Sequence, residues 1–163
     1  IVIIMLGTND AKDTAYGGPD NWQHDCGSST NTTTSDCRFA DDYNDMIALV
    51  KTLGNPKVLL NIPPPLMQEG SITANNTVIN TVYPQLVPLI AADNADAIDG
   101  VIDVFGAMGG SADWESTFPD GCSLDSTWEY CNLWCDSQSC DQCHPDDDGY
   151  TILAKAVFDG LKL

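Results

Sequence analysis

The sequence predicts an α/β fold in which helices cover both faces of a parallel sheet. Three short segments, residues 1–6, 57–62 and 97–105, are rich in apolar side chains and are typical of buried strands. Two segments with helical spacing of their apolar residues, 39–53 and 73–93, separate these strands along the chain. Strands that alternate with helices in this way indicate a parallel sheet with a helical layer on each side.

The first half of the chain supplies two strands and one amphipathic helix. Residues 1–6 are all apolar and end at Gly7, and a long polar loop follows over about 11–38. The helix at 39–53 carries apolar residues at helical spacing (Phe39, Tyr43, Met46, Ile47, Val50 and Leu53). Gly54 is expected to stop this helix, and three prolines from Pro63 to Pro65 are expected to end the strand at 57–62.

The second half is expected to hold a broken helix, the third strand and a final helix. Pro84 and Pro88 predict a kink, or two shorter helices, within 73–93. An irregular region over about 106–146 separates the strand at 97–105 from a helix at 147–162. Three aspartates, Asp146 to Asp148, lie at the start of that helix. They either stabilise the helix start, where the helix dipole favours negative charge, or bind calcium.

Residues 1–163 are expected to form a single domain. The strand at 1–6 is expected to need a further neighbouring strand that this sequence does not supply. An exposed apolar edge strand promotes aggregation, so residues 1–6 should pair with a strand on each side. In the flavodoxin-like strand order 2-1-3-4-5, the three strands of this chain match strands three to five. We therefore expect an N-terminal β-α-β piece that is absent here or belongs to a companion chain.

Charge restricts the partners that this chain can have. The formal net charge is −18, from 24 acidic against 6 basic residues. Such a surface repels nucleic-acid phosphates and anionic membranes, so neither is expected as a partner. No apolar run approaches the ~20 residues of a membrane-spanning helix.

Cysteine usage indicates an oxidising, extracellular environment. Seven cysteines occur, and five of them fall in one segment, Cys122 to Cys143. Two acceptor patterns for N-glycosylation begin at Asn31 and Asn75. Disulfides and secretion explain this pattern, with one cysteine left free or paired elsewhere; a zinc site formed by the four cysteines from Cys131 to Cys143 is the alternative.

Two short motifs carry candidate chemistry. Gly7-Thr8-Asn9-Asp10 follows the first strand at its carboxyl end, where open α/β sheets bind ligands. Asp141 precedes His144 by three residues just before the last helix. Ester hydrolysis by a serine needs a base, a group that orients it and a donor to the oxyanion. His144 fits the role of the base, Asp141 that of the orienting group and Asn9 that of the donor. Alternatively, Asn9 only forms a turn and His144 is a structural loop residue. His24, the other histidine, is expected to be an exposed loop residue.

Together these motifs resemble the SGNH (GDSL-type) hydrolases, serine esterases with a flavodoxin-like fold. The third block of that family, Gly-x-Asn-Asp, is met by Gly7-Thr8-Asn9-Asp10, and its last block, Asp-x-x-His, by Asp141-Gln142-Cys143-His144. The wording Gly-Thr-Asn-Asp-Ala-Lys, then Asn21-Trp22, looks like the branch related to carbohydrate acetylesterases. The resemblance implies hydrolysis of small acyl esters, with acetyl groups on carbohydrate as candidates, and requires no metal or organic cofactor.

The chain also departs from the family pattern. The Gly-Asp-Ser block with the nucleophile does not occur, and Gly109-Gly110-Ser111 is only a superficial substitute. A cysteine-rich insertion at about 120–143 separates Pro119-Asp120-Gly121 from His144, which leaves Asp120 as a second candidate for the acid. We therefore expect a secreted esterase portion that is inactive alone and receives its serine from an absent N-terminal segment. A non-catalytic structural or carbohydrate-binding module on the same scaffold is the alternative.

Overall fold

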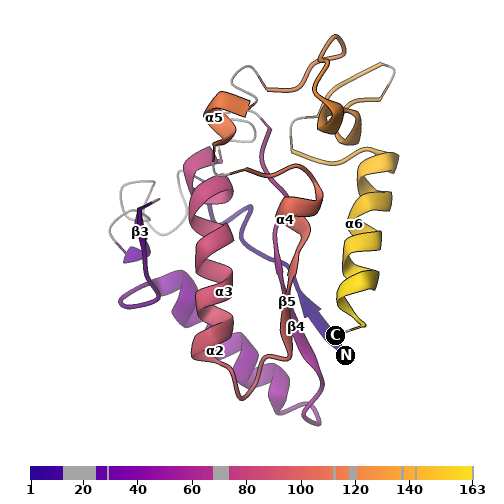
Figure 1. The fold of residues 1–163 in the computed structure, drawn as a ribbon. Coiled ribbons are helices and arrows are strands. Elements are labelled where there is room, and N and C mark those ends of the chain that lie inside the picture. Colours follow the sequence, from indigo (N-terminus) through magenta and orange to yellow (C-terminus); the bar gives the residue numbers. More distant parts are fainter. Residues whose placement is uncertain are drawn as a thin grey trace.

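A three-stranded parallel sheet forms the centre of the molecule (Figure 1). The computed structural model describes residues 1–12, 25–28, 30–67, 74–111, 113–117, 121–136, 138–141 and 143–162. The strands β1 (Val2–Ile4), β4 (Val58–Ile62) and β5 (Gly100–Asp103) lie in the order β1-β4-β5. Both strand pairs are parallel, with Ile3 opposite Leu59 and Leu60 opposite Val101.

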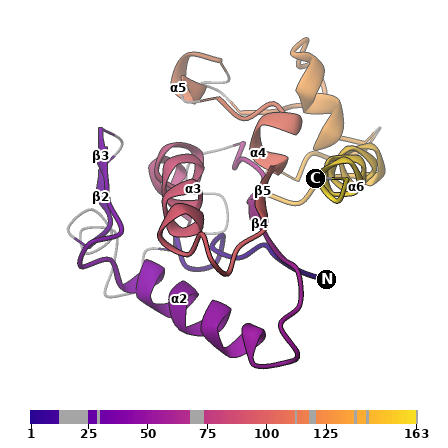
Figure 2. The ribbon, with the colours of Figure 1, turned by 60° about the horizontal axis from the view of Figure 1, so that its bottom comes forward.

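Helices cover both faces of this sheet, as the sequence predicts. The helices α2 (Arg38–Lys51) and α3 (Tyr83–Asp93) lie on one face. The short helix α4 (Val104–Ala107) and the last helix α6 (Asp147–Gly160) lie on the other (Figure 2). The result is the three-layer, flavodoxin-like arrangement expected from alternating strands and helices.

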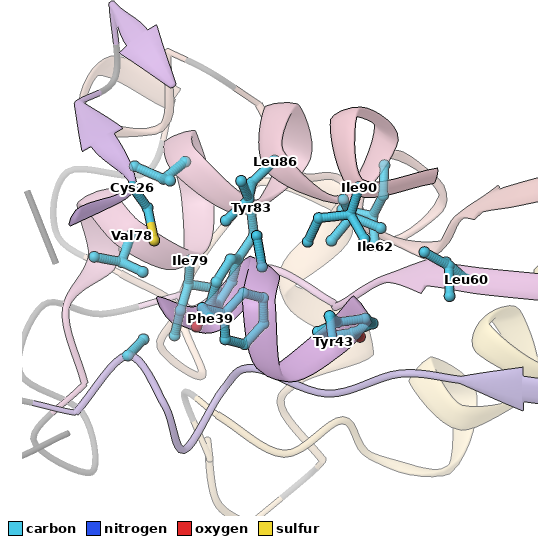
Figure 3. Close-up of a cluster of buried hydrophobic side chains, with 14 of the residues drawn as sticks. Cys26, Phe39, Tyr43, Leu60, Ile62, Val78, Ile79, Tyr83, Leu86 and Ile90 are labelled. Carbon is cyan, nitrogen blue, oxygen red and sulfur yellow. The ribbon is translucent and has the colours of Figure 1, made fainter. Parts of the chain in front are cut away.

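Each face of the sheet has its own apolar core. Figure 3 shows the core beneath α2 and α3, where Leu60 and Ile62 of β4 lie among side chains of both helices (Phe39, Tyr43, Tyr83, Leu86 and Ile90). Ile4 of β1 and Ile47 of α2 belong to the same core. On the other face, Leu59 and Ile102 pack with Trp134 against partly buried residues of α6 (Ile152, Leu153, Ala156 and Val157). The alternation within β4 explains this division, because successive strand side chains point to opposite faces.

Several element boundaries differ from the expected ones: β1 ends at Ile4 rather than at residue 6, and β5 begins at Gly100 rather than at residue 97. The third strand ends at Asp103, because the Asp103 carboxylate accepts a hydrogen bond from the Gly106 N–H (2.8 Å) and caps α4. Residues 104 and 105, expected in the strand, are therefore helical. Helix α2 ends at Lys51, so Leu53 lies outside it and is exposed.

The proline-containing segment is helical without interruption, and its geometry changes from π-helical to α-helical within the run. A π-helical turn, η3 (Val78–Val82), leads directly into α3. Pro84 is the second residue of α3, and the π-helical residues of η3 lie directly before it. Pro88 lies inside the helix, which continues to Asp93.

The loop regions contain more order than the sequence indicates. The expected loop at 11–38 includes a small hairpin of β2 (Gly27–Ser28) and β3 (Asn31–Thr32). The irregular region holds α5 (Trp114–Thr117) and a 3₁₀ turn, η4 (Glu129–Leu133). His24 and Asp120 lie outside the described residues.

Six of the seven cysteines form disulfides, which settles the interpretation of the cysteine cluster. The pairs are Cys26–Cys37, Cys122–Cys131 and Cys135–Cys140, and Cys143 is a free thiol. Disulfides of this density are typical of proteins from oxidising environments.

The Asp146 carboxylate accepts a hydrogen bond from the Gly149 N–H (2.9 Å), so the aspartate run caps a helix as predicted. Of the helices in the described residues, none combines the length and the apolar character that crossing a bilayer requires.

Candidate active site

The turn after β1 presents the Asn9 side chain at the carboxyl end of the sheet. Gly7 has a φ of +127°, which an L side chain rarely adopts, and its carbonyl accepts a hydrogen bond from the Ala11 N–H (3.0 Å). The chain therefore turns sharply, and Asn9 is exposed near the middle of the turn. Among the described residues, no hydrogen bond occupies the Asn9 amide group, so its N–H is available to a ligand.

The loop that carries Asp141 and His144 is fixed at several points. The Cys135–Cys140 disulfide closes its first part, and the Asp141 N–H donates to the Trp134 carbonyl oxygen (3.1 Å). Trp134 itself is buried in the core beside α6. The disulfide and this hydrogen bond thus tie the loop to the buried Trp134.

Asp141 holds the imidazole of His144 in one orientation. One carboxylate oxygen, Oδ2, lies 2.8 Å from Nδ1 of His144. The other, Oδ1, accepts hydrogen bonds from the N–H groups of His144 (2.9 Å) and Cys143 (2.8 Å). Burial acts to raise the pKa of Asp141, but these backbone N–H groups and the His144 side chain together hold it below its usual value. The carboxylate is therefore an acceptor, and Nε2 is the ring nitrogen left for proton transfer.

Asn9 and His144 line the same cavity, although they come from opposite ends of the chain. The cavity has a volume of about 220 Å³. Its walls come from the ends of β1 and β4, the His144 loop and the start of α6 (Met5, Thr8, Asn9, Pro63, Pro64, Cys143, His144, Pro145, Tyr150 and Leu153). A hydrogen-bond donor and an oriented base on one small cavity are two of the groups that acyl transfer requires.

The cavity also contains a thiol that is poorly suited to attack. Cys143 is half-buried beside His144, and burial, together with the Asp141 charge, raises the pKa of its thiol. The thiolate is the nucleophilic form, so this environment acts against activation. No serine occurs among the described lining residues, and Ser111 accepts a hydrogen bond from the Asp113 N–H in a turn outside the cavity.

A larger hollow elsewhere lacks the required groups. It measures about 540 Å³ and is bordered by acidic side chains at and near the start of α6 (Asp136, Asp146, Asp147 and Asp148). Neither Asn9 nor His144 contributes to it. We therefore place the candidate site in the smaller cavity, where base and donor meet.

Sequence reasoning missed the apolar walls of the site. Met5, Pro63 and Pro64 line the cavity because they lie at the carboxyl ends of two adjacent parallel strands. The position of these residues just past each strand is the signal that could have identified them. Tyr150 and Leu153 come from the first turns of α6, and only the packing of this helix on the sheet brings them to the cavity.

The fold and the cavity together define an α/β protein with a histidine–aspartate pair at the carboxyl end of its sheet. The family model of the GDSL-like lipases/acylhydrolases matches residues 1–157, and the chain belongs to this family of ester hydrolases. Comparisons with curated proteins and with solved structures gave no significant match. The resemblance seen in the two motifs is thus confirmed at the level of the family.

Proposed function

We propose that this chain is the larger part of an SGNH serine esterase whose site is the Asn9–His144 cavity. His144 removes the proton of a serine hydroxyl through Nε2 and later returns it to the leaving alcohol. Asp141 orients His144 and stabilises the imidazolium, and Asn9 donates a hydrogen bond to the oxyanion. The observation that supports this proposal best is the shared cavity, with His144 held by Asp141 at 2.8 Å.

The nucleophilic serine comes from polypeptide outside residues 1–163, either an N-terminal segment or a companion chain. No Gly-Asp-Ser occurs in the sequence. In the described part of the chain, β1 pairs only with β4, and four apolar residues along and beside its open edge are exposed (Ile1, Ile3, Met5 and Leu6). A further strand at this edge would cover these side chains and end beside the cavity. Residues 1–163 alone are accordingly expected to show no serine-dependent turnover.

The substrate class is small, uncharged acyl esters, with acetyl groups on carbohydrate as the specific case. The cavity volume of about 220 Å³ leaves room for a short acyl group, and its walls are mostly apolar. The net charge of −18 disfavours anionic esters. The carbohydrate part of the proposal is supported by the Gly-Thr-Asn-Asp-Ala-Lys wording at the turn after β1.

The protein acts outside the cell as a glycoprotein. Three disulfides fit an oxidising environment. Of the two acceptor asparagines, Asn31 is exposed on β3, whereas Asn75 is half-buried and accepts a hydrogen bond from the Val78 N–H (3.1 Å). Asn31 is therefore the better glycan acceptor.

Hydrolysis of a series of p-nitrophenyl esters by the full-length protein tests the proposed activity. We expect turnover that falls steeply from acetate to octanoate, that is lost in His144→Ala, and that an acetylated oligosaccharide inhibits competitively. His24→Ala, at the only other histidine, is the matched control and should retain full activity. Equal turnover in His144→Ala and the wild type would contradict the proposal.

A non-catalytic carbohydrate-binding module is the second candidate. It is favoured by the lack of a serine among the described lining residues. A fluorophosphonate probe separates the two, because it labels only an activated nucleophile. Labelling of a serine upstream of Ile1 supports the esterase, whereas an unlabelled full-length protein that binds acetylated oligosaccharide supports the module.

A further inference from the structure

Two buried tyrosines hold the backbone of the turn that carries Asn9. The Tyr83 hydroxyl donates a hydrogen bond to the Gly7 carbonyl oxygen (2.7 Å), and the Tyr43 hydroxyl accepts one from the Leu6 N–H (3.3 Å). The side chains come from α3 and α2 and converge on the loop after β1 (Figure 3). Tyr83 is 0% exposed and Tyr43 2% exposed, so water does not compete for either hydroxyl.

The Tyr83 ring also determines where the turn can lie. A Cβ atom placed on Gly7 would come within 2.9 Å of two ring carbons of Tyr83, so the backbone packs directly on the ring. The Phe39 ring packs in a tilted arrangement against the Tyr83 ring, at a centroid distance of 5.1 Å, and against the Tyr43 ring, at 5.0 Å. The three buried rings therefore form one packed cluster that contacts residues 6 and 7.

This support matters because the Asn9 side chain has none of its own. Its amide is exposed and, within the described residues, makes no hydrogen bond. Its direction is therefore fixed through the backbone of the turn, and the Gly7 carbonyl is the central point of that backbone. It accepts hydrogen bonds from both the Ala11 N–H (3.0 Å) and the Tyr83 hydroxyl. An oxyanion donor is effective only when it is positioned before charge develops.

We propose that Tyr83 is a positioning residue for oxyanion stabilisation, because its hydroxyl fixes the Gly7 carbonyl and thereby aims the Asn9 amide into the cavity. The inference rests on the proposed esterase function. A purely structural tyrosine would predict something else: removal of its hydroxyl would lower thermal stability and leave the turnover of the folded protein unchanged.

A double-mutant cycle between Tyr83→Phe and Asn9→Ala in the full-length protein tests the proposal. Phenylalanine keeps the ring that fills the core and removes only the hydroxyl. We expect kcat for p-nitrophenyl acetate to fall about 10- to 100-fold in Tyr83→Phe, with KM changed by less than about twofold. In the Asn9→Ala background the same change should have no further effect on kcat, because Tyr83 acts through Asn9.

Inhibition by an alkylboronic acid provides the second measurement. The boronate adduct is tetrahedral, so its affinity should fall in parallel with kcat in Tyr83→Phe. Tyr130→Phe is the matched control: its hydroxyl makes no hydrogen bond in the described part of the chain, and both kcat and boronate affinity should be unchanged. Thermal unfolding midpoints verify that each variant is folded.

The outcomes separate this inference from the proposed function. If His144→Ala abolishes turnover but Tyr83→Phe leaves kcat within about twofold of the wild type, only the positioning role is overturned. An undiminished effect of Tyr83→Phe in the Asn9→Ala background also overturns it. If His144→Ala leaves turnover unchanged, the esterase proposal and the inference both fail. If Tyr83→Phe does not fold, Tyr43→Phe replaces it in the double-mutant cycle. If Tyr43→Phe then lowers kcat as much in the Asn9→Ala background as in the wild type, the proposal that these tyrosines act through the turn is overturned.

Discussion

Replacing Asp141 with asparagine tests the histidine–aspartate pair most sharply, because the structure fixes how the new amide must lie. Oδ1 of Asp141 accepts two backbone N–H bonds, at 2.8 and 2.9 Å, so the amide oxygen of asparagine must take that position. Its NH₂ group then faces Nδ1 of His144, which lies 2.8 Å from Oδ2 in the wild type. Nδ1 must become the acceptor, and the proton moves to Nε2. The imidazole can then no longer accept the proton of a nucleophile.

The expected cost to catalysis follows from this tautomer change. The same substitution in the serine-protease triad lowers kcat by about 10⁴, which corresponds to about 5.5 kcal/mol in the activation free energy. Stability should change little, because two backbone hydrogen bonds remain and both side chains of the pair are exposed, at 54% for Asp141 and 65% for His144. The assay is kcat for p-nitrophenyl acetate with the full-length protein, with the unfolding midpoint measured alongside.

Asp136→Asn is a matched control for this substitution. The Asp136 carboxylate also accepts two backbone N–H bonds, from Gln138 (2.6 Å) and Ser139 (2.8 Å), but it faces no histidine in the described residues. Its replacement should leave kcat unchanged. The reasoning is refuted if Asp141→Asn retains more than about a tenth of wild-type activity, or if the two variants lose activity equally.

Three further predictions concern the core and the cavity. Burial raises the pKa of Tyr43 to about 12, so its contribution to stability is complete below pH 10 and is lost as pH rises through about 12. In Tyr43→Phe, up to about 2.7 kcal/mol of this alkaline loss in the free energy of unfolding should disappear. Urea unfolding below pH 10 and above pH 12 measures the loss, and an equal loss in the variant and the wild type would contradict the prediction. Gly7→Ala should destabilise the protein by about 2–5 kcal/mol through strain and contact with Tyr83. Gly54→Ala is the control, because no atom lies within 4 Å of the new Cβ and only the backbone strain remains. Chemical denaturation should show a smaller loss of stability for Gly54→Ala than for Gly7→Ala, and equal losses would contradict the role of the Tyr83 ring. Iodoacetamide should alkylate Cys143 slowly at neutral pH and faster as pH rises, because the pKa of its thiol is raised. Mass spectrometry measures the alkylation, and rapid labelling at neutral pH would contradict the prediction.

The parts of the fold that local sequence determines were predicted well. Residues 58–62 are apolar at nearly every position because both faces of β4 are buried, and three prolines stop the strand where the structure ends it. The run from Asp146 to Asp148 marks the start of α6 because helix caps are local contacts. The pairing of Asp141 with His144 is also local, and three-residue spacing was enough to suggest it.

Contacts between distant residues could not be predicted in this way. The third strand stops at Asp103 because that side chain caps a helix, although Val104 and Phe105 continue the apolar pattern. The tyrosine anchors join residues far apart in the sequence, Tyr83 to Gly7 and Tyr43 to Leu6, and helical spacing identified Tyr43 only as a core residue. Disulfide pairing is likewise a property of the folded chain, since seven cysteines allow many connectivities.

The central claim is that Asn9 and His144 serve one reaction in one cavity, and a crystal structure of the full-length protein after fluorophosphonate treatment tests it most directly. We predict a phosphonylated serine in the cavity, with its phosphoryl oxygen in hydrogen-bond contact with the Asn9 amide and Nε2 of His144 facing the serine oxygen. A phosphonate attached elsewhere, with neither side chain in contact, would contradict this account.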